Sequence, residues 1–281
     1  MSYALLIRNA RLVDASAPDP RPGSLLVING RIAELDPVEA PSTARWVDAH
    51  GQWLAPGIID MGVFATDKPA FHFGGITRAA LMPDGAQQLD NPGLVERAAK
   101  GGKPDLWVHP LAAATKGLAG RELAEIGLMQ AAGARAVATG RARIADSGVM
   151  RRLLSYAAAL GLTTIVHAED EGLTAGAVAT DGEMATRLGL PCAPAMAEAM
   201  AIARDLALVE ETGAPLLFRQ VTTARGFDLI RAAKASGLPV QCGITPAHLF
   251  LSDTAMGDFR TFARLSPPLR SEADRQACLA A

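Results

Sequence analysis

The sequence predicts an α/β protein: a (β/α)8 TIM-type barrel preceded by a small β-sandwich-like domain. From residue 54 onward, short apolar runs alternate with segments of helical periodicity, which is the pattern of parallel βα units. Before residue 54, strand-like runs are separated only by turn residues. We therefore expect a β-domain at residues 1–53 and a barrel at residues 54–281, with strands one to seven present and the barrel incomplete.

In the first domain, one hairpin is the clearest local feature. Asn29-Gly30 separates two apolar runs, and Asn-Gly in this position strongly favours a two-residue β-turn. A Pro-rich loop is expected at Ser16–Pro22. The expected strands are Ala4–Asn9, Arg11–Asp14, Ser24–Ile28, Arg31–Leu35 and Trp46–Asp48.

The barrel elements follow from the alternation of apolar runs and helical periods. The expected strands are Ile58–Phe64, Ile76–Met82, Leu106–Ala112, Ala134–Ala138, Thr163–His167, Leu216–Val221 and Val240–Ile244. The expected helices are Gly120–Ala132, Gly148–Leu160, Ala195–Thr212 and Thr223–Ser236. Between strands one and two, the eleven residues 65–75 contain Pro69 and a Gly-Gly pair, too little for a full crossover helix of the usual minimum of about 10–12 residues.

The sequence ends at Ala281, inside what looks like the helix before an eighth strand. An open barrel would expose strand edges and apolar interior. Either the natural chain is longer or a partner covers the gap, and we favour the first.

Composition narrows the function classes. The net charge of −2 in 281 residues argues against a nucleic-acid surface or a basic membrane patch. The three cysteines, Cys192, Cys242 and Cys278, lack CxxC spacing, which disfavours a disulfide framework or zinc ribbon and suits a reducing compartment. With no signal-peptide pattern and no apolar run of membrane-spanning length, we expect a soluble cytoplasmic protein.

Several sequence blocks together resemble the dihydroorotases, a group of cyclic amidohydrolases. Residues 56–60 read Pro-Gly-Ile-Ile-Asp, as in the family's first barrel strand. The other similar blocks are Gly-Gly-Ile-Thr at 74–77, Met-Pro-Asp at 82–84, His-Ala-Glu-Asp at 167–170, Thr-Pro-Ala-His-Leu at 245–249 and Ser-Pro-Pro-Leu-Arg at 266–270. The resemblance spans nearly the whole sequence, and it implies a barrel whose mouth, in active relatives, holds catalytic zinc.

The resemblance also shows which metal ligands this sequence lacks. Gly62 and Phe64 stand where the family has its His-x-His pair, Gly140 falls at the bridging Asp or carbamylated Lys, and Gln220 replaces another His. Only His167 is retained. Because a catalytic zinc requires about three protein ligands plus water, we expect no metal cofactor and no catalytic residues.

The family's substrate anchors are altered too. Thr66 aligns with the Arg that grips the substrate carboxylate, Asp84 with an Asn, and Ser266 with another Asn. A negative Asp84 would repel an anionic substrate unless it is neutralised. With Asp60 retained at the strand end, these positions are expected to form a vestigial pocket.

Two segments narrow the resemblance further. Residues 111–125 and Asp60-Met-Gly-Val63 are similar to inactive dihydroorotase-like chains that associate with aspartate transcarbamoylase. This resemblance implies that the present chain is non-catalytic and assists the assembly or regulation of the aspartate transcarbamoylase catalytic chain in pyrimidine biosynthesis. It also implies that the present chain forms a homo-oligomer. Two alternatives remain: an active zinc-dependent cyclic amidohydrolase rebuilt around His167 and His72 with an Asp on strand eight, or a binding module whose mouth is lined by Phe64 and Phe71.

Overall fold

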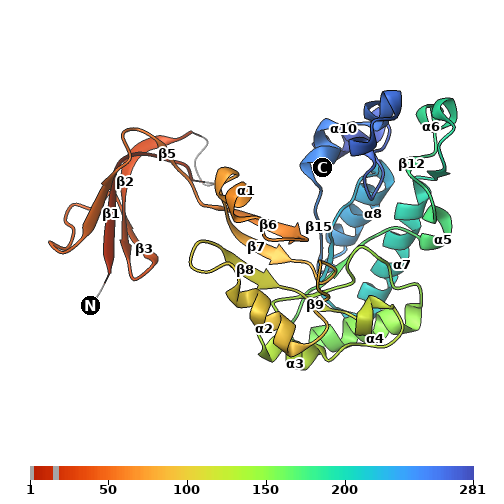
Figure 1. Cartoon of the computed structure of the whole chain (residues 1–281), viewed down its shortest axis with the longest axis horizontal. Helices are drawn as coiled ribbons and strands as arrows, with labels where there is room; N and C mark the ends of the chain where they lie inside the picture. The colour runs from red at the N-terminus through yellow and green to blue at the C-terminus, as the bar shows by residue number, and fades with distance from the viewer. Residues whose placement is uncertain (1–2, 15–18) are drawn as a thin grey trace. The chain divides into compact units, whose positions relative to one another are not determined.

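The computed structural model describes residues 3–14 and 19–281, and the chain divides into two units, Met1–Ile58 and Ile59–Ala281 (Figure 1). The division falls later than the 53/54 boundary expected from the sequence. Part of the predicted Pro-rich loop, residues 15–18, lies outside the described residues. The two units are described in turn.

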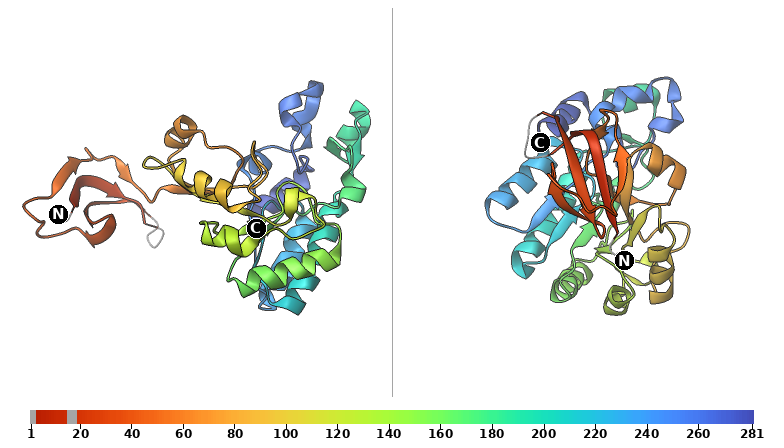
Figure 2. Two further views of the ribbon diagram at one scale, coloured as in Figure 1. Left: turned by 60° about the horizontal axis from the view of Figure 1, so that its bottom comes forward. Right: turned by 90° about the vertical axis from the view of Figure 1, so that its left-hand side faces the viewer.

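The first unit is a five-stranded sheet. Its strands are β1 (Ala4–Leu12), β2 (Arg21–Ile28), β3 (Arg31–Leu35), β4 (Arg45–Asp48) and β5 (Trp53–Leu54). Their order is β3-β2-β1-β4, with β5 also paired to β1, and the strands lie side by side in Figure 2, right. The predicted hairpin is present between β2 and β3, where Asn29 and Gly30 have φ values of 51° and 77°, as the expected turn requires.

The second unit contains all seven expected strands, in chain order around a curved parallel arrangement. They are β6 (Ile58–Val63), β7 (Ile76–Leu81), β8 (Trp107–Pro110) continued by β9 (Ala112–Ala113), β10 (Val137–Ala138), β11 (Thr164–Val166), β14 (Leu216–Phe218) and β15 (Val240–Cys242). Strands β6, β7 and β8 form one sheet, and five others form a second, ordered β9-β10-β11-β14-β15. The amide of Leu111, between β8 and β9, donates to the carbonyl of Leu81 and links the two sheets.

Helices cover the outer side of these strands (Figures 1 and 2). The longer ones are α2 (Pro92–Lys100), α4 (Ser147–Ala159), α7 (Met196–Thr212), α8 (Ala224–Ala235) and α10 (Glu272–Ala280). Shorter elements are α1 (Lys68–Phe73), η1 (Lys116–Leu118), α3 (Ile126–Ala131), α5 (Glu171–Thr174), β12 (Ala179–Thr180), α6 (Glu183–Leu188), β13 (Cys192–Ala193), α9 (Pro246–Phe250), η2 (Asp253–Phe259) and η3 (Thr261–Ala263). No helix in the described part of the chain is long and apolar enough to cross a membrane.

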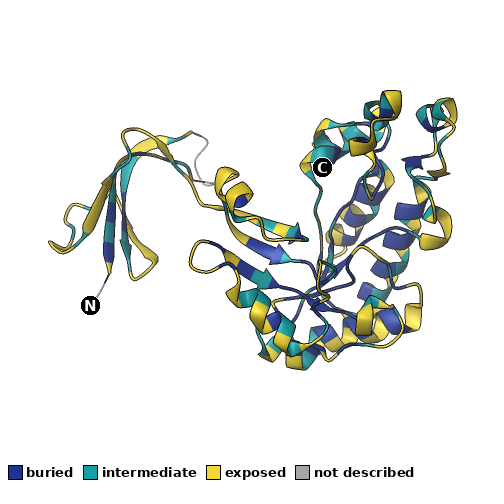
Figure 3. Ribbon diagram, viewed as in Figure 1, coloured by how far each residue is buried: buried dark blue, intermediate teal, exposed yellow. Residues whose placement is uncertain are grey.

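The main core lies between the strands and this helical layer (Figure 3). In α4, Val149, Met150, Leu153, Leu154 and Ala157 recur at helical spacing and are all buried. They pack in one cluster with strand residues on the outward face of the sheet. Burying one such leucine contributes about 1.5–3 kcal/mol, so this interface is a major source of the barrel's stability.

One expectation about helices needs correction. The helix expected at Gly120–Ala132 begins only at Ile126, because Gly120 adopts a φ of 71° and Thr115 forms a β-bridge with Leu123. Between β6 and β7, where no full crossover helix was expected, the chain forms only the six-residue helix α1, capped by the Asp67 side chain. Phe71 in α1 is buried against Val63, Ala79 and Leu106 and therefore belongs to the core.

Candidate functional site

The residues singled out from the sequence lie near the carboxyl ends of the barrel strands. Phe64 follows β6, Asp84 follows β7, Gly140 follows β10, His167 follows β11 and Gln220 follows β14. Parallel strands place these ends at one mouth of a barrel, where active sites of this fold are found. The order of strands thus brings together residues that are up to half the chain apart.

Phe64 contacts two arginines that were not among the site residues predicted from the sequence. The guanidinium carbons of Arg141 and Arg219 lie 4.4 Å and 5.3 Å from the centre of the Phe64 ring. Both distances are typical of cation–π attraction. A Cβ added at Gly62 would lie 3.4 Å from Cδ of Arg219, so glycine leaves room for this arginine. Two positive charges therefore occupy the place where the resemblance puts zinc ligands.

Asp84 is neutralised by Arg141. The Arg141 backbone amide and Nε each donate to Oδ2 of Asp84 at 2.9 Å, and Nη2 donates to the Asp84 carbonyl at 2.9 Å. Gly140 permits this arrangement, because it has a φ of 76° and a Cβ there would lie 2.9 Å from Cγ of Asp84. The charge of Asp84 is therefore neutralised by Arg141, which follows β10.

His167 is buried, and both of its ring nitrogens are engaged. Nε2 lies 3.0 Å from Oε2 of Glu169, and Nδ1 lies 3.4 Å from Nη2 of Arg219. Nε2 thus faces a carboxylate and Nδ1 faces a guanidinium, so both ring nitrogens already have a polar neighbour. Neither nitrogen is left free to bind a metal in this arrangement.

Behind His167 lies a buried network centred on Arg270. Nη2 of Arg270 is 3.2 Å from Oε1 of Glu169 and 3.6 Å from Oε2 of Glu198. Its Nε and Nη1 donate to the hydroxyls of Thr222 and Thr180 at 2.9 Å and 3.1 Å. Glu198 also accepts hydrogen bonds from the backbone amides of Thr222 and Thr223. The sequence placed Arg270 only within a family-like block and gave no sign that it pairs with Glu169 or Glu198.

Charges in this network shift the pKa of Glu169. Burial raises the pKa of that carboxyl, but the hydrogen bond and charge of His167 and the charge of Arg270 outweigh burial and hold it below the ordinary value of 4.5. Glu169 is therefore ionised at neutral pH. Its charge is shared between the imidazole and the guanidinium.

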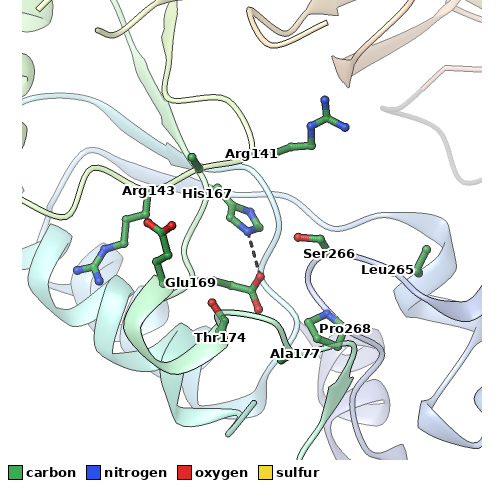
Figure 4. A pocket seen from close by; sticks show the side chains of 11 residues that line it. Arg141, Arg143, His167, Glu169, Thr174, Ala177, Leu265, Ser266 and Pro268 are labelled. Carbon is green, nitrogen blue, oxygen red and sulfur yellow. Dashed lines mark hydrogen bonds and ion pairs between the residues drawn. The ribbon is translucent and has the colours of Figure 1, made fainter. Parts of the chain in front are cut away.

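A cavity of about 200 Å³ opens beside His167 and Glu169 (Figure 4). It is lined by Arg141, Arg143, Ser266, Pro268 and others, and Figure 4 shows the hydrogen bond between His167 and Glu169 at its wall. Arg143 is not free, because it forms an ion pair with Asp170. Of the positions predicted for a vestigial pocket, only His167 and Ser266 line this cavity.

The remaining predicted positions lie outside it. Oδ1 of Asp60 accepts from the amide of Gly62 at 3.0 Å, so this carboxylate caps its own strand end. Thr66 is exposed. The Gln220 side chain is buried, and its Oε1 has no hydrogen-bond partner within the described residues.

A zinc centre does not fit these residues. Within residues 3–14 and 19–281, no group of three or more His, Cys, Asp or Glu side chains is placed to hold a metal ion. Gly62, Phe64 and Gln220 supply no imidazole or carboxylate, and the guanidiniums on Phe64 would repel a divalent cation. His72, considered as a replacement ligand, is on the exposed surface of α1.

Comparison with known proteins places the chain in a family. Residues 45–224 match the family model described as dihydro-orotase-like. The chain is 37% identical over 284 residues to a dihydroorotase of Pelotomaculum thermopropionicum, covering 96% of this chain and 66% of that protein. It is 37% identical to a dihydroorotase of Anaeromyxobacter sp. strain K (99% of this chain, 68% of that one) and 34% identical to a dihydroorotase-like protein of Pseudomonas aeruginosa (96% and 68%). The chain thus spans about two thirds of the length of these relatives.

Solved structures agree on the fold. The L-hydantoinase of Arthrobacter aurescens matches 98% of this chain and 66% of its own with a TM-score of 0.80 at 22% identity. A D-hydantoinase from Thermus sp. matches 99% of this chain and 66% of its own with a TM-score of 0.75, also at 22% identity. At this identity the likeness shows the architecture alone, an amidohydrolase-type barrel with an N-terminal β-sheet. Taken together, the matches establish that the chain belongs to the dihydroorotase-like family of cyclic amidohydrolases.

Proposed function

We propose that this chain is a non-catalytic dihydroorotase homologue. The observation that carries the proposal is the occupation of the barrel mouth by guanidinium groups. Arg219 lies against both Phe64 and His167, and Arg141 lies against Phe64. Hydrolysis of a cyclic amide in this family requires a metal-activated water, and the described residues 3–14 and 19–281 offer no set of three metal-binding side chains.

We further propose that the chain acts as an assembly or regulatory partner of the aspartate transcarbamoylase catalytic chain, and that it is a homo-oligomer. The support is the resemblance of residues 111–125 and Asp60–Val63 to chains with that role. The proposed location remains cytoplasmic.

Two measurements on the full-length purified protein test the first proposal. We expect less than stoichiometric zinc by elemental analysis and no dihydroorotate hydrolysis above the buffer rate, with and without added zinc. One equivalent of tightly bound zinc together with turnover would refute it. The active, rebuilt-site alternative would also require the His167→Ala variant to lose that turnover.

The partnership is tested by co-expression with the aspartate transcarbamoylase catalytic chain from the same genome. We expect the two chains to elute together in size-exclusion chromatography with light scattering, at a mass above that of either alone. Separate elution at micromolar concentrations of both chains would exclude a stable complex. The same experiment on the isolated chain measures whether it is a homo-oligomer.

A further inference from the structure

The outward face of α7 carries a row of exposed apolar side chains. Up to residue 210, its exposed positions lie alternately four and three residues apart, and they are Met196, Met200, Ala203, Ala207 and Glu210. We call the first four residues the α7 seam. Met196 is 58% exposed and Met200 is 47% exposed. None of the exposed residues between positions 196 and 209 is charged, so this face of the helix is apolar throughout.

The helices on either side of α7 have charged outward faces instead. Both α4 and α8 pack against α7, and α7 and α8 lie side by side in Figure 1. The exposed side chains of α4 include Arg151 and Arg152, and those of α8 include Arg225 and Arg231. A helix on the surface of a barrel normally has one apolar face toward the core and one polar face toward water. With apolar residues on its outward face as well, α7 departs from this pattern.

The spacing of the α7 seam matches that of two helices packed together. Intervals of four and three residues average 3.5, which keeps one line of side chains directed at a neighbouring helix. Alanine side chains are small, so the axes of two such helices can approach to about 8 Å. The 17 residues of α7 extend over about 25 Å, which is the length of helix that the seam could contact.

The α7 seam is also complementary to itself. The long side chains of Met196 and Met200 occupy its amino-terminal half, and the small side chains of Ala203 and Ala207 occupy its carboxy-terminal half. In an antiparallel pair of identical helices, each half lies against the opposite half, so each methionine meets an alanine. A two-fold axis perpendicular to α7 produces this pair, because it places the same surface of each copy face to face.

The charges at the two ends of the seam agree with the antiparallel pair. Glu198 in the first turn of α7 accepts a hydrogen bond from the amide of Thr223, which caps α8, so the two helices begin side by side. Arg225 in the first turn of α8 therefore lies beside the amino-terminal half of the seam, and Glu210 lies at its carboxy-terminal end. Both are exposed, and neither forms an ion pair within the described residues. The two-fold axis brings the Glu210 end of one copy to the Arg225 end of the other and aligns the two helix dipoles favourably.

We propose that the outward face of α7 is a self-association surface, on which a second copy of this chain packs its own α7 in antiparallel orientation. The α7 seam is the apolar centre of the interface, and the charged outward faces of α4 and α8 are its polar rim. This inference rests on the homo-oligomer of the proposed function and names the face that forms it. It does not depend on whether the barrel is catalytic.

The test is analytical ultracentrifugation of the full-length protein and of its Ala203→Glu variant. Ala203 lies in the middle of α7, so the two introduced carboxylates would lie close to each other across the two-fold axis. The matched control is Ala273→Glu, which changes an exposed alanine of α10, a helix that packs on α8 and α9. Circular dichroism and Tm establish that each variant is folded.

We expect the wild type and Ala273→Glu to form dimers or larger even-numbered assemblies, and the Kd of self-association to rise at least about tenfold in Ala203→Glu. Glu210→Arg should also weaken self-association, and adding Arg225→Glu should restore it, because the charge pair is then reversed. No recovery in this double variant would overturn the antiparallel arrangement.

The remaining outcomes separate this inference from the proposed function. A wild type that stays monomeric up to about 100 μM would overturn both this inference and the proposed homo-oligomer. A wild-type oligomer that Ala203→Glu leaves intact would overturn this inference alone. If Ala203→Glu kept its self-association but no longer eluted with the aspartate transcarbamoylase catalytic chain, the face would bind that chain, and the inference would again be wrong.

Discussion

Replacing Arg270 by methionine removes the cation that joins two buried carboxylates. The Arg270 side chain is 2% exposed, and the Glu169 and Glu198 side chains it contacts are 8% and 0% exposed. Methionine keeps an unbranched apolar stem like that of arginine but has no guanidinium and cannot donate a hydrogen bond. The change therefore removes the charge and the donors while keeping the apolar stem.

The expected loss of stability follows from what remains buried. Removing one partner of a buried ion pair costs about 3–5 kcal/mol, because the other charge is left unpaired. The hydroxyls of Thr180 and Thr222 also lose a donor, but each keeps another hydrogen bond, to the Leu269 carbonyl and to Glu198 respectively. We therefore expect the Arg270→Met variant to lose about 3–5 kcal/mol of unfolding free energy at pH 7.

The loss should depend on pH with a definite sign. The folded-state pKa of Glu169 lies below 4.5, since the interactions with His167 and Arg270 overcome the opposing effect of burial. A depressed pKa contributes stability that is present above the unfolded-state value and is lost as the pH falls through the folded-state value. Without Arg270 that contribution to stability shrinks. The difference in unfolding free energy between the variant and the wild type should therefore be largest near pH 7 and should decrease below pH 4.5.

Urea denaturation followed by circular dichroism at pH 7 and pH 4 measures both effects. The control is Arg231→Met, which breaks a 2.9 Å pair with Asp228 between two exposed side chains and should cost no more than about 1 kcal/mol. A loss below about 1 kcal/mol in Arg270→Met, or a loss unchanged between the two pH values, would refute the reasoning.

Three further changes test other parts of the barrel. Gly140→Ala places a Cβ 2.9 Å from Cγ of Asp84 at a φ of 76°, so it should lower the free energy of unfolding by about 1–3 kcal/mol. An unchanged Tm in thermal unfolding would contradict the description of that turn. Leu153→Ala, in a fully buried position of α4, should lose about 2–5 kcal/mol in the same assay, and a smaller loss would mean that the helix is less tightly packed than described. Glu198→Gln puts an NH2 group among the amides of Thr222 and its neighbour, so hydrogen exchange at Thr222 should become faster while exchange in α4 is unchanged.

The sequence by itself determined the architecture and most of what the mouth lacks. The alternation of apolar runs and helical periods located all seven barrel strands, because both signals are local. The Asn29-Gly30 hairpin followed from two adjacent residues. The glycine, phenylalanine and glutamine at positions 62, 64 and 220 could be read directly against the family pattern.

What the mouth contains instead was decided by tertiary structure. Arg141 and Arg219 converge on Phe64 from different strands, and Arg270 reaches Glu169 across about a hundred residues of chain. In the sequence, Arg141 and Arg219 were indistinguishable from solvated surface charge, and Arg270 stood in a family-like block without a visible partner. Pairing of side chains far apart along the chain depends on how the strands and helices pack, and no local pattern encodes it. Packing of distant segments thus set the charge at the mouth, whereas local residue patterns set the fold.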